Sequence, residues 1–228
     1  MKNLALLVCM AVLYTTSVKS QTTENPNYGL KSHETLEITR IGNSPSLTTV
    51  YFTVENKITG GYFCADKNIF LIYPDGTKSR LVSSNGIPIC PDSYKFKMVG
   101  EKLSFELTFP ALKQNIHWID IIEDCSDNCF SFYGVCLDKD LNKAIDDASD
   151  LAERNEMAKA LISFTDIAAT IESMNSGMSG LIYVSIIRLA KETGDKTKAA
   201  EWYMKLKSSS IPRKDLYLKN LNAQGIIY

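Results

Sequence analysis

The sequence predicts an α+β protein with two domains, an antiparallel β-sandwich followed by an all-α domain. Before residue 138, apolar and polar side chains alternate along many short segments, as in strands with one buried face. From Lys139 onward, apolar residues recur every three or four positions, as along one face of a helix. We therefore expect the sandwich over residues 28–138 and the helical domain over residues 139–228.

The stretch Ile116–Asp138 closes the first domain and leads into the second. An apolar run, a short acidic loop and a second alternating run indicate the last hairpin of the sandwich. Only Asp138–Asp140 separate this hairpin from the first expected helix, which is too short a connector for a flexible tether. Asp138 or Asp140 is expected to cap that helix. We therefore expect the two domains to form one rigid body.

Turn residues divide the first domain into eight expected strands. Pro74-Asp75-Gly76 predicts a hairpin, since proline pre-sets φ and glycine accepts a positive φ. Val99-Gly100-Glu101 predicts a second hairpin. The number and spacing of strands favour an immunoglobulin-like sandwich, with an eight-stranded barrel as the alternative. The expected strands are Thr35–Ile41, Thr48–Glu55, Asn68–Tyr73, Thr77–Ser83, Tyr94–Met98, Lys102–Phe109, Ile116–Ile122 and Phe130–Leu137.

Five helices are expected in the second domain. Arg154-Asn155 interrupts the first apolar stripe, and Asn175–Gly180 is expected to form a loop. Gly194-Asp195 predicts a tight turn, and Pro212 is placed as the first residue of the last helix. The apolar stripes cover residues 141–152 and 157–171, and the remaining helices are Leu181–Thr193, Lys196–Ser208 and Arg213–Ala223.

Part of the helical half resembles a known repeat. The turn and helix of Gly194–Ala199, followed by Tyr203, Leu206 and Pro212, are similar to the second half of a tetratricopeptide repeat. A second set fits the same frame one unit earlier: Asn155, Ala160, Phe164 and Ile167. Ile187 and Ala190 depart from the pattern, because a small residue and an aromatic are usual there. The resemblance implies TPR-like helical hairpins with a concave face for peptides.

Residues 1–20 have the pattern of a signal peptide. Lys2 precedes the apolar run Leu4–Leu13, and Val18-Lys19-Ser20 offers a cleavage site before Gln21. We expect the mature protein to be exported, periplasmic or secreted, with no transmembrane segment. Residues 21–27 are polar and contain proline, so we expect a disordered leader there.

A signal peptide, a sandwich and helical hairpins in this order are similar to exported bacterial envelope proteins of unassigned activity. The segments GIPICPDSYKF and FYGVCLD look like recurring features of such sandwiches. The resemblance implies no chemistry.

The mature chain keeps five of the six cysteines, and export permits disulfides. We expect Cys125 to pair with Cys129, with a metal or redox pair as alternatives that the spacing and the acidic surroundings disfavour. We expect Cys64 to pair with Cys90 across the sandwich. Cys136 is then left reduced on a core-facing position.

No motif predicts catalysis, a metal site or a cofactor site. His117 and Asp120 are expected on opposite faces of a strand, which separates them. The acidic residues near them are expected to form a solvated hairpin tip and not a calcium site: Asp120, Glu123, Asp124, Asp127 and Asn128. Tyr62, Tyr73 and Tyr94 are expected to fill strands and not to form a sugar platform. The net charge of −1 gives no case for nucleic acid.

The functional prediction is a non-enzymatic protein that binds a protein or peptide partner. Trp202, Tyr183 and Tyr203 on the third and fourth expected helices are the candidate contacts, with Trp202 partly exposed. The alternative is a carbohydrate- or small-ligand-binding module that uses the sandwich.

Overall fold

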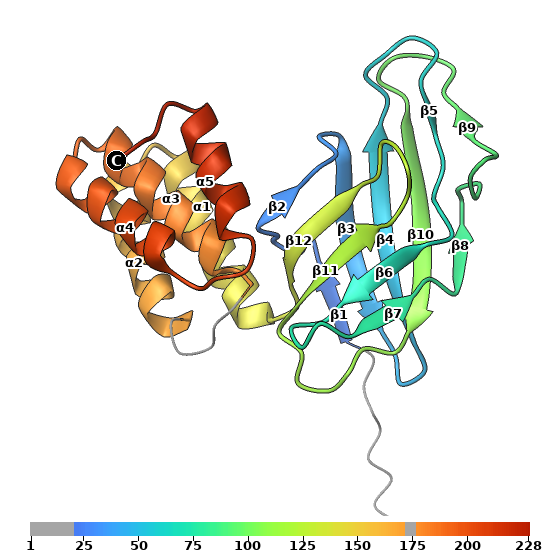
Figure 1. The fold of residues 1–228 in the computed structure, drawn as a ribbon, viewed down its shortest axis with the longest axis horizontal. Helices are drawn as coiled ribbons and strands as arrows, with labels where there is room; N and C mark the ends of the chain where they lie inside the picture. Colours follow the sequence, from blue (N-terminus) through green and yellow to red (C-terminus); the bar gives the residue numbers. More distant parts are fainter. Residues whose placement is uncertain (1–20, 172–176) are drawn as a thin grey trace, which may run out of the picture.

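A computed structural model describes residues 21–171 and 177–228. Antiparallel sheets form the N-terminal part and five helices form the C-terminal part, and the two parts lie side by side (Figure 1). The α+β class expected from the sequence is confirmed. The expected signal peptide lies outside the described residues.

Two five-stranded antiparallel sheets and one two-stranded sheet make up the first part. The first sheet has the strand order β1(Gln21–Glu24), β3(Leu36–Asn43), β4(Leu47–Glu55), β10(Lys102–Pro110), β8(Ser83–Asn85). The second sheet has the order β2(Leu30–Lys31), β12(Ser131–Cys136), β11(Trp118–Glu123), β6(Ile69–Ile72), β7(Lys78–Arg80). The strands β5(Tyr62–Phe63) and β9(Tyr94–Lys95) pair beside them.

The inward faces of both sheets share one core, so the strands form a sandwich. Alternation places Val50, Phe52 and Val54 of β4 inside, and each is no more than 2% exposed. Phe52 lies opposite Phe105 of β10 in the register, and its ring centroid is 6.0 Å from that of Phe132 in the other sheet. The core therefore follows from the period-2 pattern of the sequence.

Three details of the strand prediction are wrong. The residues expected to be a disordered leader include β1, because Gln21–Glu24 pair with Arg40–Asn43 of β3 and so satisfy their backbone groups. The segment Tyr94–Met98 forms no hairpin with β10, since β9 pairs with β5 instead. The expected strand Thr77–Ser83 divides into β7, which pairs with β6, and the start of β8, which pairs with β10.

The helices are α1(Lys139–Glu153), α2(Met157–Ile171), α3(Ser179–Glu192), α4(Lys196–Ser208) and α5(Lys214–Ala223). Each helix from α1 to α4 packs against the next, and α5 packs against α3 and α4. Asn155 and Gly194 have positive φ angles of 62° and 81° and follow the ends of α1 and α3.

Two helix boundaries differ from the expectation. The helix α3 begins two residues before Leu181, and α5 begins after Arg213, whose φ is 60°. Pro212 is therefore not the first helical residue. None of the helices within residues 21–171 and 177–228 is long and apolar enough to cross a bilayer.

Candidate functional site

The segment that follows β1 is hydrogen-bonded to α1. The Asn27 backbone N–H donates to Asn142 Oδ1 at 2.8 Å, and Asn27 Nδ2 donates to Asp146 Oδ1 at 2.8 Å. Asn142 Nδ2 donates to the carbonyl oxygens of Cys136 and Asp138, both at 3.0 Å. Asn142 is 6% exposed, so this one buried amide ties three chain segments together.

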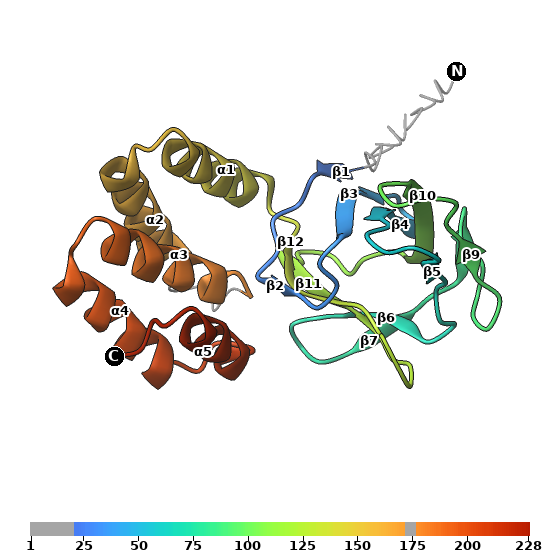
Figure 2. The same ribbon diagram turned by 90° about the horizontal axis from the view of Figure 1, so that it is seen from above.

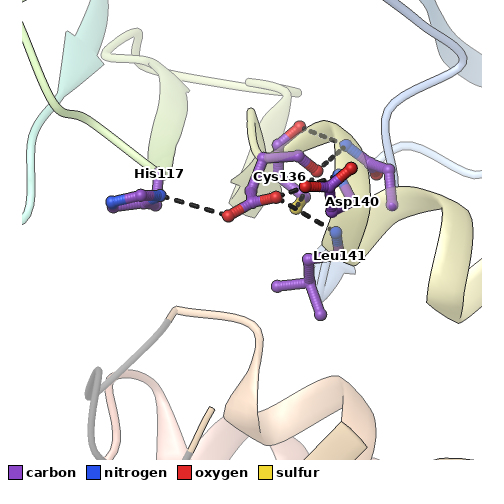
Figure 3. A network of polar contacts seen from close by, with 6 residues as sticks. His117, Cys136, Asp140 and Leu141 are labelled. Atoms are coloured by element: carbon purple, nitrogen blue, oxygen red, sulfur yellow. Dashed lines mark hydrogen bonds and ion pairs between the residues drawn. The ribbon is translucent and has the colours of Figure 1, made fainter. Parts of the chain in front are cut away.

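Asp138 caps the start of α1, and it is one of the two residues, Asp138 and Asp140, that the sequence offered as the cap. Asp138 Oδ1 accepts from the backbone N–H groups of Asp140 and Leu141, both at 3.0 Å. His117 Nδ1 lies 3.3 Å from Asp138 Oδ2, and Figure 3 shows His117 beside this first turn. The cap sets the direction in which α1 leaves the sandwich.

An ion pair between the buried Asp120 and the exposed Arg213 joins β11 to the start of α5. Asp120 is 4% exposed, accepts from the Gly134 N–H at 2.7 Å and lies 2.7 Å from Arg213 Nη2. The Arg213 guanidinium also lies 4.8 Å from the centre of the Tyr133 ring. Asp120 thus faces the helices, and its placement in a solvated hairpin tip is wrong.

A tyrosine of α5 packs between the domains. Tyr217 of α5 is 2% exposed, and two glycines on different segments contact its ring. A Cβ at Gly29 would lie 1.8 Å from Tyr217 Oη, and a Cβ at Gly180 would lie 2.1 Å from Tyr217 Cε2. Neither position accepts a side chain without moving Tyr217.

Beside these contacts lies a cleft of about 370 Å³ that both domains line. One wall is the segment 25–28 with residues 37–39 of β3, and the other wall is formed by α1, α2 and α3. Figure 2 shows α1 and α3 on one side and the chain after β1 on the other. The apolar lining comes from Ile38, Ile145, Phe164 and Leu181, and the polar lining includes Asn25, Glu37, Ser149 and Ser185.

The β3 edge of this cleft is only partly paired. β1 covers residues 40–43 of β3, and one more bond joins the Asn25 N–H to the Thr39 carbonyl at 2.9 Å. Residues 36–38 have a strand partner on their β4 side alone. Lys31 Nζ donates to the Leu36 carbonyl at 3.1 Å, so a lysine side chain covers this short edge.

Burial raises the pKa of Asp120, although the Gly134 N–H and Arg213 oppose the shift. A raised folded-state pKa gives stability that is fully present below the unfolded-state pKa of about 4 and is lost as the pH rises through the folded-state value. We expect the free energy of unfolding of the natural chain, minus that of Asp120→Asn, to fall as the pH rises above about 4. Urea unfolding of both proteins at a series of pH values measures this difference. A difference that grows with pH would show that attraction to Arg213 outweighs desolvation.

Both disulfides suggested by the sequence are present. Cys125–Cys129 closes the loop between β11 and β12, with a Cα–Cα distance of 5.6 Å. Cys64–Cys90 joins the segment after β5 to the segment before β9, and so does not bridge the two sheets as expected. Cys136 is free and buried, and burial raises the pKa of its thiol to about 12. Two disulfides fit an extracellular or periplasmic protein.

The aromatic residues proposed as partner contacts are buried. Trp202, Tyr183 and Tyr203 are 8%, 5% and 4% exposed, so the expected exposure of Trp202 is wrong. Trp202 packs edge-on against Tyr183 at 5.0 Å, which explains its burial: the ring lies between α3 and α4. These residues form the helical core, and we place the candidate binding surface in the cleft instead.

The other residues weighed in the sequence do not assemble into a site. Glu123 is 7% exposed and accepts backbone N–H groups from Asp66 and Phe130, so it too lies inside and not at a solvated tip. Tyr73 is 3% exposed whereas Tyr62 is 68% exposed, so they share no exposed platform. Among residues 21–171 and 177–228, no cluster of His, Cys, Asp or Glu could hold a metal ion.

The cleft residues have a weak signal in the sequence. Ser149 follows Ile145 by four positions in α1, and Ser185 follows Leu181 by four positions in α3. Residues four apart share a helix face, so each hydroxyl continues an apolar stripe. A small polar side chain in such a position indicates a helix surface that lies near another element but is not packed against it.

Searches of family models, curated proteins and solved structures find no match to this chain.

Proposed function

We propose that this chain is an exported, non-enzymatic envelope protein that binds an extended segment of a protein partner in the cleft between its domains. The observation that carries the proposal is the lining of that cleft: a short strand edge without a strand partner on one wall and helix surface around the half-buried Leu181 on the other. An extended peptide can pair with the edge through its backbone and place side chains against the helices.

The dimensions support a few side chains of a peptide. A volume of about 370 Å³ is at the lower end of the range of ligand sites. Serine hydroxyls and Glu37 provide polar contacts at the margin, and the half-buried Leu181 provides an apolar one. Displacing Lys31 from the Leu36 carbonyl would free one acceptor for the incoming strand.

The packing of the helices and the sandwich supports such binding. Consecutive helices pack as neighbours, and Asp195 caps α4 by accepting from the Lys198 N–H at 2.9 Å after the Gly194 turn. This supports TPR-like hairpins, whose concave face binds extended segments. An immunoglobulin-like sandwich supplies the opposing edge. Export rests on the signal pattern of residues 1–20 and on the disulfides.

Filling the cleft should weaken peptide binding. In Ser149→Trp and Ser185→Trp the indole occupies the space between helix and strand edge, whereas both serines are only half-buried, so the fold should tolerate them. A displayed random-peptide library is selected on the mature chain, 21–228. We expect enriched peptides with micromolar dissociation constants, weakened at least tenfold by either substitution.

Thr170→Trp is the matched control, because Thr170 is exposed on α2 and does not line the cleft. It should leave the affinity of the enriched peptides unchanged. Enrichment of no peptide, or equal loss of affinity in the control, would overturn the proposal.

A further inference from the structure

The end of the sandwich that carries β5 and β9 exposes a cluster of large apolar side chains. We name this cluster the apolar tip: Ile58, Tyr62, Met98 and Val99, which are 66%, 68%, 68% and 52% exposed. Three of these residues lie on two loops, 56–61 and 96–101, and Tyr62 directly follows the first loop. Figure 1 shows these loops projecting at the top of the sandwich, clear of the helices.

The two loops are fixed to each other. The Gly100 N–H donates to the Asn56 carbonyl at 2.8 Å, and the Asn56 N–H donates to the Glu101 carbonyl at 2.9 Å. Asn56 Nδ2 donates to the Met98 carbonyl at 2.8 Å. Because Asn56 is 5% exposed, these bonds are shielded from water and hold Met98 and Val99 beside the Ile58 loop.

Basic residues flank the apolar tip along the chain. Lys57, Lys95, Lys97 and Lys102 lie on or next to the two loops, against the carboxylates of Glu55 and Glu101. Glu55 pairs with Lys57 and Lys102, and Glu101 accepts from the Tyr94 hydroxyl at 2.6 Å. Within the described residues, neither Lys95 nor Lys97 forms a salt bridge.

We propose that the apolar tip inserts into the headgroup region of an anionic lipid bilayer while the surrounding lysines contact the lipid phosphates. The charge around the tip is complementary to such a surface, and each lysine near it adds attraction. A stable protein interface needs roughly 800 Å² per partner. Shallow insertion of a few side chains needs no such area. This inference is independent of peptide binding in the cleft.

Vesicle binding tests the proposal. The mature chain is sedimented with vesicles of phosphatidylglycerol in phosphatidylcholine, and with vesicles of phosphatidylcholine alone. We expect binding to the anionic vesicles only, weakened by salt. Met98→Ser combined with Val99→Ser should reduce the partition coefficient at least tenfold. Lys95→Gln and Lys97→Gln should each reduce it about fivefold.

The matched control is Leu47→Ser, since Leu47 is 42% exposed at the opposite end of β4 from Glu55. It should leave vesicle binding unchanged. Met98→Trp provides a second measurement, because brominated lipids quench an indole that inserts among them. Absence of binding, equal binding to neutral vesicles, an unquenched indole or tip variants that bind as well as the natural chain would overturn the proposal.

Discussion

The substitution Tyr217→Ala should separate the unfolding of the two domains. Tyr217 is 2% exposed and lies against Gly29 of the sandwich side and Gly180 of α3, so its ring packs between the domains. Removing a buried aromatic ring costs about 3–5 kcal/mol, because contacts are lost and a cavity remains. We expect calorimetry to show two transitions in place of one, with the helical domain unfolding first.

A loss of stability alone would not show that the domains have been uncoupled. Leu206→Ala is therefore the control, since Leu206 is fully buried in α4 within the helical core. Leu206→Ala should lower the free energy of unfolding by about 2–5 kcal/mol. It should separate the unfolding of the sandwich from that of the helices less than Tyr217→Ala does. A single transition in Tyr217→Ala, shifted as in the control, would show that the interface does not depend on this ring.

Long alternating segments made most of the sandwich predictable. β4 and β10 each keep strict alternation over nine residues, so their buried faces follow directly from the sequence. The strands β1, β2 and β5 have four, two and two residues. In such short segments no periodicity can develop, and only pairing with a neighbouring strand makes them strands. Residues 21–27 were expected to be disordered because they are polar and contain proline, and the pairing of Gln21–Glu24 with β3 is what makes β1 a strand.

The candidate site was less predictable, because it depends on which sheet face the helices cover. Asp120 was expected at a solvated hairpin tip, because nothing in the sequence shows that α5 covers its face of β11. Between Ile119 and Ile121 the register with β12 shifts, and Gly134, with φ of 63°, turns its N–H to the Asp120 carboxylate. A bulge of this kind depends on the partner strand and leaves no mark in the sequence of β11.

Asn142→Leu should detach the segment 25–28, which forms one wall of the cleft, from α1. The leucine keeps the volume of the side chain but removes the acceptor of the Asn27 N–H and the donor to the carbonyl oxygens of Cys136 and Asp138. Buried polar groups without partners cost about 1–3 kcal/mol each. Asn27 is only half-buried, so water can replace part of its lost hydrogen bond. We therefore expect the free energy of unfolding to fall by about 3 kcal/mol in total.

The effect should be local as well as global, and hydrogen exchange can show this. In the natural chain the Asn27 amide bonds to a side chain that is 6% exposed, so it should exchange slowly. In Asn142→Leu it should exchange at least tenfold faster, and peptides selected on the cleft should bind more weakly. Asn85→Leu is the control, because Asn85 is an exposed residue of β8 whose amide contacts Glu106 at 2.9 Å. It should change stability by less than about 0.5 kcal/mol. If the Asn27 amide stayed protected in Asn142→Leu, the segment after β1 would be held by the sandwich alone, and α1 would not set the width of the cleft.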